Sequence, residues 1–274
     1  IGNYAPGNLV ILDAISMKIL KTIPLTMEKD GKQTESRAGA VVEDGNRIIV
    51  ALKDGTSVWA IDTDKPGFPV THKFSDIGGG KPALHDAFLT PNGSHYIVAS
   101  QGSKTVWVLD VETMKPIAEV ATGETPHTGP GAAWGNYIYI PSLGEGLITV
   151  VDITTWKPVK YIKTGGPGLF VRSYSKNPKY PYVWADAAFG YHKDEIYVID
   201  ARINEIVKTI IPVKGESSWH PEFTYDGKFV YVVSQTANEV EVYDAFTFDI
   251  VKRIKSDTPS AISNVGLRIE EPGL

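Results

Sequence analysis

Short runs of alternating hydrophobic and polar residues recur along the whole chain, and six of them end in an aspartate. These runs read LVILD, VWAID, VWVLD, ITVVD, IYVID and VEVYD, and they end at Asp13, Asp62, Asp110, Asp152, Asp200 and Asp244. A period of two is typical of β-strands. Because no segment shows a convincing apolar period of 3.6 residues, the pattern predicts an all-β protein with little helix.

The aspartates are separated by 49, 48, 42, 48 and 44 residues. A period of this length that is built only from short strands is typical of β-propeller blades, which have about four antiparallel strands each. About six such repeats fill the 274 residues, and no linker-like change in composition interrupts them. We therefore predict one β-propeller domain over residues 1–274.

The two ends of the chain leave the closure of the propeller open. Too few residues precede Asp13 for a complete blade, and Ser260–Ile269 is a candidate for an outer or closing strand. Either the ring closes by pairing the two termini, or N-terminal blades are missing from this chain.

The six repeated aspartates have a structural interpretation. An Asp carboxylate can accept backbone N–H groups in the turn that follows a strand, which is the Asx-type turn. Asn-Gly and Asp-Gly pairs such as Asp44–Gly45 and Asp226–Gly227 mark further turns, because both residues tolerate positive φ. The Trp-Asp signature of WD40 blades is absent, which argues against that class of protein-docking propeller.

Composition excludes several classes of site and partner. The net charge is −5 and no block of Lys and Arg occurs, so the sequence does not favour nucleic acid or an anionic membrane as a partner. No apolar run approaches the ~18–20 residues of a membrane span. The absence of cysteine excludes disulfides, Cys-ligated metals and attachment of heme c within these residues.

Four irregular insertions rich in Gly and Pro interrupt the repeat at the same phase, each at the start of an inner strand. They are Ile77–Asp86, Thr125–Trp134, Thr164–Tyr174 and Ser218–Phe223. Loops at one mouth of a propeller channel commonly carry function, so we expect these insertions to meet there.

The insertions would bring together side chains that suit a flat, anionic, aromatic ligand, because rings stack on apolar faces and guanidinium groups bind carboxylates. The candidates are the titratable residues His85, His127, Tyr174 and His220, the cations Arg37, Lys81 and Arg172, and the aromatic residues Trp134, Phe170, Trp219 and Phe223. Taken alone, each His is better explained as a satisfied turn or core residue, whereas the four aligned insertions together favour a site. His72, His95 and His192 are expected to be surface residues.

At these insertions the chain resembles the heme d1-binding β-propeller of cytochrome cd1 nitrite reductases and their relatives, which include the periplasmic dihydro-heme d1 dehydrogenase. The most specific similarity is that of Thr125–Ala132 (TPHTGPGA) to a Thr-Pro-His-Pro-Gly-Arg-Gly-Ala element. Weaker similarities follow in the same order along both sequences: Tyr4–Gly7, Ser36–Ala40, Leu84–Asp86, Gly168–Tyr174, Pro221–Phe223 and Thr258–Ser260.

The resemblance implies an eight-bladed propeller that holds heme d1 and its iron, in a periplasmic or otherwise exported protein with a c-type cytochrome as a possible electron partner. It places the proximal iron ligand and any heme c in blades upstream of Ile1, so it assigns no metal ligand to this chain. The insertions and the resemblance together predict these residues for cofactor binding: Tyr4, Arg37, His85, Trp134, Phe170, Arg172, His220, Phe223 and Ser260.

The resemblance also implies a catalytic pair, His127 and Tyr174. The reductases present two histidines to nitrite, and Tyr174 stands where the second is expected. A protonated His pair suits dehydration of nitrite, whereas a His–Tyr pair suits proton removal from a porphyrin side chain. We therefore predict an oxidoreductase of the dihydro-heme d1 dehydrogenase type. The alternatives are a nitrite reductase that forms nitric oxide, and a non-catalytic heme d1 carrier or protein-docking propeller.

Overall fold

The computed structural model describes residues 1–263 and divides the chain into two compact units, residues 1–126 and 127–274. Among the described residues, the secondary structure is almost entirely β, and the one helix is the short 3-10 helix η1 (Gln235–Ala237). The prediction of an all-β protein with little helix is therefore confirmed. The single domain over 1–274 stays a prediction.

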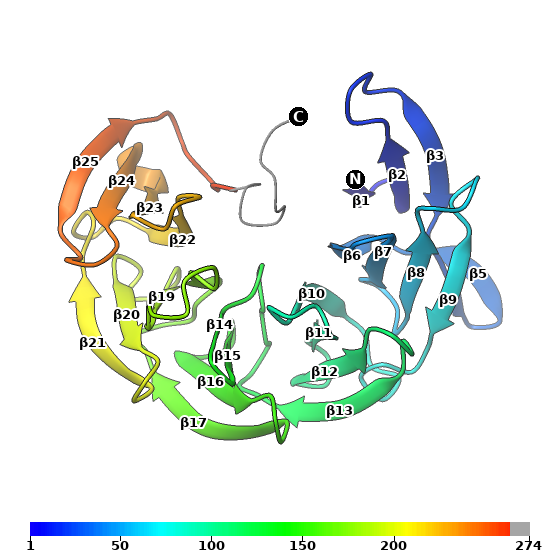
Figure 1. The fold of residues 1–274 in the computed structure, drawn as a ribbon, viewed down its shortest axis with the longest axis horizontal. Helices are drawn as coiled ribbons and strands as arrows, with labels where there is room; N and C mark the ends of the chain where they lie inside the picture. The colour runs from blue at the N-terminus through cyan, green and yellow to red at the C-terminus, as the bar shows by residue number, and fades with distance from the viewer. Residues whose placement is uncertain (264–274) are drawn as a thin grey trace. The chain divides into compact units, whose positions relative to one another are not determined.

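Unit 1 contains one three-stranded sheet, a hairpin and two four-stranded sheets, all antiparallel and all in sequence order (Figure 1). The three-stranded sheet consists of β1 (Gly2–Asn3), β2 (Asn8–Leu12) and β3 (Ile19–Pro24), and the hairpin of β4 (Thr26–Lys29) and β5 (Lys32–Glu35). The first four-stranded sheet consists of β6 (Ala38–Asp44), β7 (Arg47–Leu52), β8 (Val58–Asp62) and β9 (Val70–Phe74). The second consists of β10 (Leu84–Leu89), β11 (His95–Ser100), β12 (Thr105–Asp110) and β13 (Pro116–Ala121).

Unit 2 contains three four-stranded antiparallel sheets, again in sequence order. The first consists of β14 (Ala133–Trp134), β15 (Tyr137–Pro141), β16 (Leu147–Asp152) and β17 (Lys157–Lys163). The second consists of β18 (Val171–Ser173), β19 (Tyr182–Asp186), β20 (Ile196–Asp200) and β21 (Glu205–Ile210). The third consists of β22 (Ser218–Phe223), β23 (Phe229–Ser234), β24 (Glu239–Asp244) and β25 (Ile250–Lys255). Five four-stranded blades and one three-stranded blade confirm the predicted β-propeller with about six repeats. Residues 260–263 form no strand, and the rest of the candidate strand Ser260–Ile269 lies outside the described residues.

The repeated aspartates close the turn after the third strand, as predicted. The Oδ1 atom of Asp110 accepts the Thr113 amide at 2.7 Å, and that of Asp152 accepts the Thr154 amide at 2.8 Å. Hydrogen bonds from Thr113 lower the pKa of the Asp110 carboxyl, so it is ionised in this turn. The interpretation of these aspartates as structural residues is confirmed.

The same turns also join neighbouring blades. The turn residue Phe248, with φ of +64°, packs edge-on against Tyr182 and Trp184 of the preceding blade, at ring distances of 4.9 and 5.8 Å. In unit 1, the turn residue Met114 is buried in a core cluster that includes Ile49 and Tyr96. In these two cases a turn residue of one blade packs into the blade that precedes it within the same unit.

Candidate functional site

The loop that carries His127 is held by hydrogen bonds and by close packing. The His127 amide donates to the carbonyl oxygen of Pro141 at 3.0 Å, and the Gly131 amide donates to that of Thr128 at 3.1 Å. Gly129 has φ of +52°, and a Cβ atom there would lie 2.8 Å from Cδ1 of Phe170. A larger residue would clash with Phe170 and would also be strained, so the Gly-rich sequence of this loop has a steric reason.

The contacts of His127 determine which of its ring nitrogens carries a proton. Its Nδ1 atom lies 2.8 Å from the carbonyl oxygen of Leu169, and the side chain is 6% exposed. Because a carbonyl oxygen can only accept, Nδ1 must be protonated, and in the neutral ring the lone pair is on Nε2. This contact therefore selects one tautomer of the neutral ring.

Phe170 connects His127 to His220, so the three insertions of unit 2 meet as predicted. The Phe170 ring contacts His127 edge-on at a centroid distance of 5.5 Å and His220 at 4.1 Å. His220 is buried and lies in β22 where the pairing with β23 is irregular, and its φ is +55°. A positive φ is uncommon for a residue other than glycine, and such conformations are enriched at functional sites.

Asp186, which sequence analysis missed, lies behind this cluster. Its Oδ1 atom accepts the amides of Leu169 at 2.6 Å and Phe170 at 3.1 Å, and its Oδ2 atom accepts the His220 amide at 3.0 Å. Burial raises the pKa of the Asp186 carboxyl to about 6, although these three hydrogen bonds act to lower it. One carboxylate thus holds the backbone of two insertions, at Leu169 and Phe170 in one and at His220 in the other.

The Arg172 guanidinium is bound within the protein. Its Nη2 atom lies 2.7 Å from Oε1 of Glu222, its Nη1 atom lies 3.2 Å from the carbonyl oxygen of Gly131, and both side chains are almost fully buried. This ion pair braces the loop that follows His127. Arg172 thus has a structural partner, and its role in binding the cofactor stays a prediction.

Tyr174 contacts a different set of residues. Its hydroxyl donates to the carbonyl oxygen of Tyr225 at 2.7 Å, and its ring lies 5.7 Å from that of Phe223. Burial raises its pKa, with smaller contributions from Asp226 and Tyr225. Phe170 and Tyr174 flank the short strand β18, so they are separated by roughly 13 Å at about 3.3 Å per residue. The structure does not show Tyr174 hydrogen-bonded to His127.

The other predicted aromatic residues of unit 2 pack mainly into the protein. Phe223 is 1% exposed and packs edge-on against Tyr180 at 5.5 Å in the core, while Trp134 packs against the core cluster around Tyr139. Trp219 contacts Phe189 at 6.3 Å. Of the four aromatic candidates, Phe170 alone bridges the two histidines.

In unit 1, two predicted residues meet at a site that also includes a missed lysine. Tyr4 is 51% exposed, and its ring has the Arg37 guanidinium and the Lys53 ammonium at 5.4 Å each from its centroid. Arg37 also donates from Nε to Oδ1 of Asp54 at 3.0 Å, and this contact lowers the pKa of the Asp54 carboxyl. Two cations against one exposed ring suit the binding of an anionic group.

The other predicted residues lie on β10, in the turn before it and in the segment after β25. His85, on β10, has its Nδ1 atom 2.8 Å from Oδ1 of Asp86, and Lys81 lies in the Gly-rich turn that precedes this strand. Ser260 is exposed in the segment after β25, where the Thr258 amide donates to Oδ1 of Asn238 at 2.8 Å. His72 and His192 are exposed and His95 is partly exposed, as expected for surface residues.

The donor set fits the class of ligand that the sequence predicts. Heme d1 is flat and carries carboxylates, and the chain offers an aromatic ring beside imidazoles in unit 2 and paired cations in unit 1.

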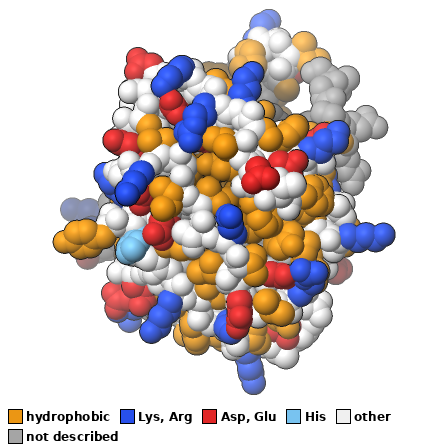
Figure 2. Space-filling view, turned by 90° about the vertical axis from the view of Figure 1, so that its left-hand side faces the viewer, with side chains coloured by type: hydrophobic (Ala, Val, Ile, Leu, Met, Phe, Trp, Pro, Cys, Tyr) orange, Lys and Arg blue, Asp and Glu red, His pale blue; other side chains and the backbone are white. Residues whose placement is uncertain are grey.

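The face drawn in Figure 2, over the outer strands β21 and β25 of unit 2, mixes basic, acidic and hydrophobic side chains and carries no extended basic patch. No helix in the described part of the chain is long and apolar enough to cross a membrane.

Comparisons with known proteins agree with this picture. The family model "Cytochrome D1 heme domain" matches residues 1–268. A curated dihydro-heme d1 dehydrogenase from Pseudomonas aeruginosa is 33% identical over 98% of this chain and 54% of its own length. Protein NirF from Stutzerimonas stutzeri is 27% identical over 100% of this chain and 71% of its own length.

Among solved structures, dihydro-heme d1 dehydrogenase NirN in complex with DHE superposes with a TM-score of 0.83 at 30% identity, covering 97% of this chain and 57% of that one. Hydrazine synthase from Kuenenia stuttgartiensis, at 14% identity and a TM-score of 0.56, shares the fold. The chain thus spans just over half the length of the dehydrogenase that it matches. The predicted resemblance is confirmed: the chain belongs to the cytochrome D1 heme domain family.

Proposed function

We propose that this chain is the heme d1-binding part of an oxidoreductase that converts dihydro-heme d1 to heme d1 during heme d1 biosynthesis. The observation that carries the proposal is the fixed tautomer of His127, whose Nδ1–H donates to Leu169 and whose Nε2 holds the lone pair. The relative named dihydro-heme d1 dehydrogenase supports the choice of substrate. Because this chain spans 54% of that relative, the activity is proposed for the protein that contains this chain.

The reaction removes two hydrogen atoms from a saturated side chain of the macrocycle, which amounts to two protons and two electrons. His127 is the proposed base: Nε2 accepts a proton, and the resulting positive charge is stabilised by the bond from Nδ1 to the Leu169 carbonyl and by the nearby Asp186 carboxylate. The Phe170 ring packs against the imidazole. The second proton is released to water. The two electrons leave one at a time, through the substrate iron, to a c-type cytochrome, which is the proposed electron partner and is reduced in two one-electron steps.

Tyr174 is the proposed second residue of the pair. Since it lies at the other end of β18 from Phe170, we propose that His127 and Tyr174 contact different edges of one extended macrocycle and are not hydrogen-bonded to each other. In this arrangement the Tyr174 hydroxyl exchanges its bond to the Tyr225 carbonyl for a bond to the ligand.

The cations around Tyr4 are proposed to bind carboxylates of the macrocycle. Arg37 and Lys53 both face the exposed Tyr4 ring, and the Lys53 ammonium can reach an anionic group without leaving that ring. We also propose that the protein is periplasmic, which fractionation of cells that produce it would test, and that the proximal iron ligand and heme c lie outside residues 1–274.

The experiment is reconstitution of the protein with dihydro-heme d1 and an electron acceptor, followed by visible spectroscopy. The proposal predicts conversion to the spectrum of heme d1 in the parent protein and binding without conversion in His127→Ala. Binding without conversion in the parent would instead favour a heme d1 carrier. Turnover of nitrite with a reductant would favour the reductase alternative.

A further inference from the structure

One middle strand departs from the repeat at a single buried position. In each four-stranded blade, the first residue of the second strand pairs with the aspartate that ends the third strand. Counting four residues onward from this shared register gives the equivalent residues Ala51, Ala99, Pro141, Asp186 and Val233. Four blades thus have a buried apolar residue where the blade with β19 has a buried carboxylate.

The fold itself therefore does not need an acid at this position. Burial of a carboxylate is unfavourable unless hydrogen bonds compensate it, whereas a small apolar residue has no such cost. The compensation at Asp186 comes from the amides of Leu169, Phe170 and His220, which belong to two of the three insertions that meet around His127. The departure from the repeat thus coincides with the candidate site.

We infer that Asp186 is a positioning residue that orients His127 and His220 through the backbone to which it is bonded. Its Oδ1 atom fixes the Leu169 amide, and the carbonyl of the same residue receives Nδ1–H of His127. Its Oδ2 atom fixes the amide of His220, whose ring packs on Phe170. This inference rests on the proposed function, because it assigns Asp186 to the reaction in which His127 is the base.

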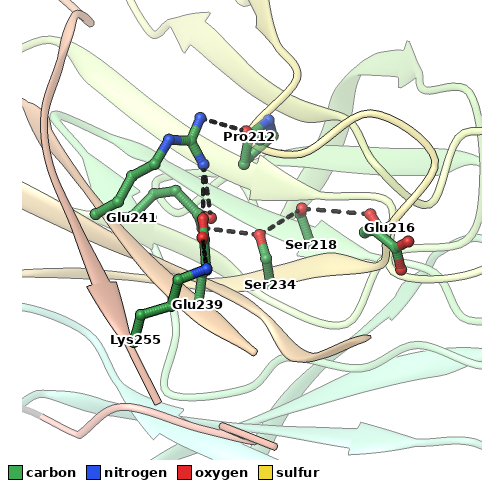
Figure 3. Close-up of polar contacts among 8 residues, drawn as sticks. Pro212, Glu216, Ser218, Ser234, Glu239, Glu241 and Lys255 are labelled. Atoms are coloured by element: carbon green, nitrogen blue, oxygen red, sulfur yellow. Dashed lines mark hydrogen bonds and ion pairs between the residues drawn. The ribbon is translucent and has the colours of Figure 1, made fainter. Parts of the chain in front are cut away.

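The chain offers a matched control in the next blade. Glu241, on β24, is also a fully buried acid: it accepts Ser234 Oγ at 2.7 Å and lies 3.2 Å from Nη1 of Arg253, and Ser234 in turn contacts Ser218 (Figure 3). Burial raises its pKa as it does that of Asp186. Glu241→Gln therefore neutralises a buried carboxylate without touching the amides of Leu169, Phe170 or His220.

The test compares Asp186→Asn with Glu241→Gln by two measurements. The first is the tautomer of His127, from the ¹⁵N shifts of its ring in the ligand-free protein, with assignment by His127→Ala. The second is the rate of conversion of dihydro-heme d1. In Asp186→Asn we expect a mixture of His127 tautomers and a rate of conversion that is at least tenfold lower. For comparison, a catalytic group that is misplaced by about 1 Å can lower a rate by about a hundredfold. Glu241→Gln should match the parent in both.

An Asp186→Asn protein with only the Nδ1–H tautomer and the parental rate would overturn the inference. Asp186→Ala, which has the residue that the repeat carries at Ala51 and Ala99, is a second variant in case the first does not fold. Failure of both variants to fold would overturn the inference by making Asp186 a folding residue. If the parent protein does not convert dihydro-heme d1, the proposed function fails, but the tautomer measurement still decides whether Asp186 orients His127.

Discussion

The Nδ1 atom of His127 lies 2.8 Å from the carbonyl oxygen of Leu169, and this one contact fixes the tautomer of the ring. The contact spans two consecutive blades of unit 2, because His127 precedes β14 and Leu169 precedes β18. The base of the proposed reaction is therefore oriented by backbone from the neighbouring blade, and that backbone is held by Asp186.

Asp186 should make stability depend on pH in a predictable direction. Its pKa is raised from 3.8 to about 6 in the folded protein, so between these values the native state binds more protons than the unfolded state. The contribution of Asp186 to the free energy of unfolding is therefore fully present below pH 4 and is lost as the pH rises through 6. Urea unfolding of the parent and of Asp186→Asn at pH 4.5 and pH 7 should show a smaller loss of stability with rising pH in the variant. An equal loss in both proteins would contradict this assignment.

Removal of one partner from the buried ion pair of Arg172 and Glu222 should strongly lower the free energy of unfolding. Glu222→Gln leaves the Arg172 guanidinium buried without its ion partner, and such changes typically cost about 3–5 kcal/mol. Replacement of both residues, as in Arg172→Met with Glu222→Leu, should cost less than the single change because no buried charge remains. Urea unfolding measures both variants, and a double variant less stable than Glu222→Gln would show that the pair has another role.

Tyr174→Phe separates two roles of one hydroxyl. Loss of the bond to the Tyr225 carbonyl should lower the free energy of unfolding by about 1 kcal/mol. If the hydroxyl also assists the reaction, the rate of conversion should fall by about tenfold or more. The control for the rate is Tyr180→Phe, which removes another hydroxyl that donates to a carbonyl, that of Ala245 at 2.8 Å. It also removes the acceptor of Trp184 Nε1, so its loss of stability should be larger while its rate of conversion stays parental. Parental conversion by Tyr174→Phe would exclude Tyr174 from the pair.

The cations around Tyr4 should contribute to affinity for the ligand in a salt-dependent way. Lys53→Ala and Arg37→Ala should each weaken binding of dihydro-heme d1, because each removes a positive charge that faces an exposed ring. The loss should shrink at high ionic strength, since exposed charges are screened. Lys21→Ala, which removes an exposed lysine from β3 in the same unit, is the control and should leave titrations unchanged. Equal affinities in all four proteins would exclude this site from ligand binding.

The blades could be predicted from sequence because their signals are local. Alternation of period two and an aspartate that bonds to its own turn are both written in consecutive residues, as at Val106–Asp110. The convergence of His127, Phe170 and His220 followed from their shared phase in the repeat. These features need no knowledge of which side chains meet across blades.

The partners of the candidate residues were harder to predict because they lie far away in sequence. Glu222 is 50 residues from Arg172, so nothing in the sequence showed that this guanidinium is already bound. Phe170 and Phe223 both look like aromatic walls in sequence, yet one contacts His220 and the other lies in the core. Asp186 did leave a signal in the sequence, because the equivalent residues of the other four blades are apolar. They are Ala51, Ala99, Pro141 and Val233. This signal appears only when the second strands of the blades are aligned by their pairing with the third strands.

The measurement that tests the central claim most directly is the conversion of dihydro-heme d1 by His127→Ala beside the parent protein, with bound ligand quantified in both. We predict that the variant binds the ligand and that its rate of conversion falls by about a hundredfold or more, because a positioned general base typically contributes 10²–10⁴-fold. Conversion by His127→Ala at the parental rate would contradict the assignment of His127 as the base.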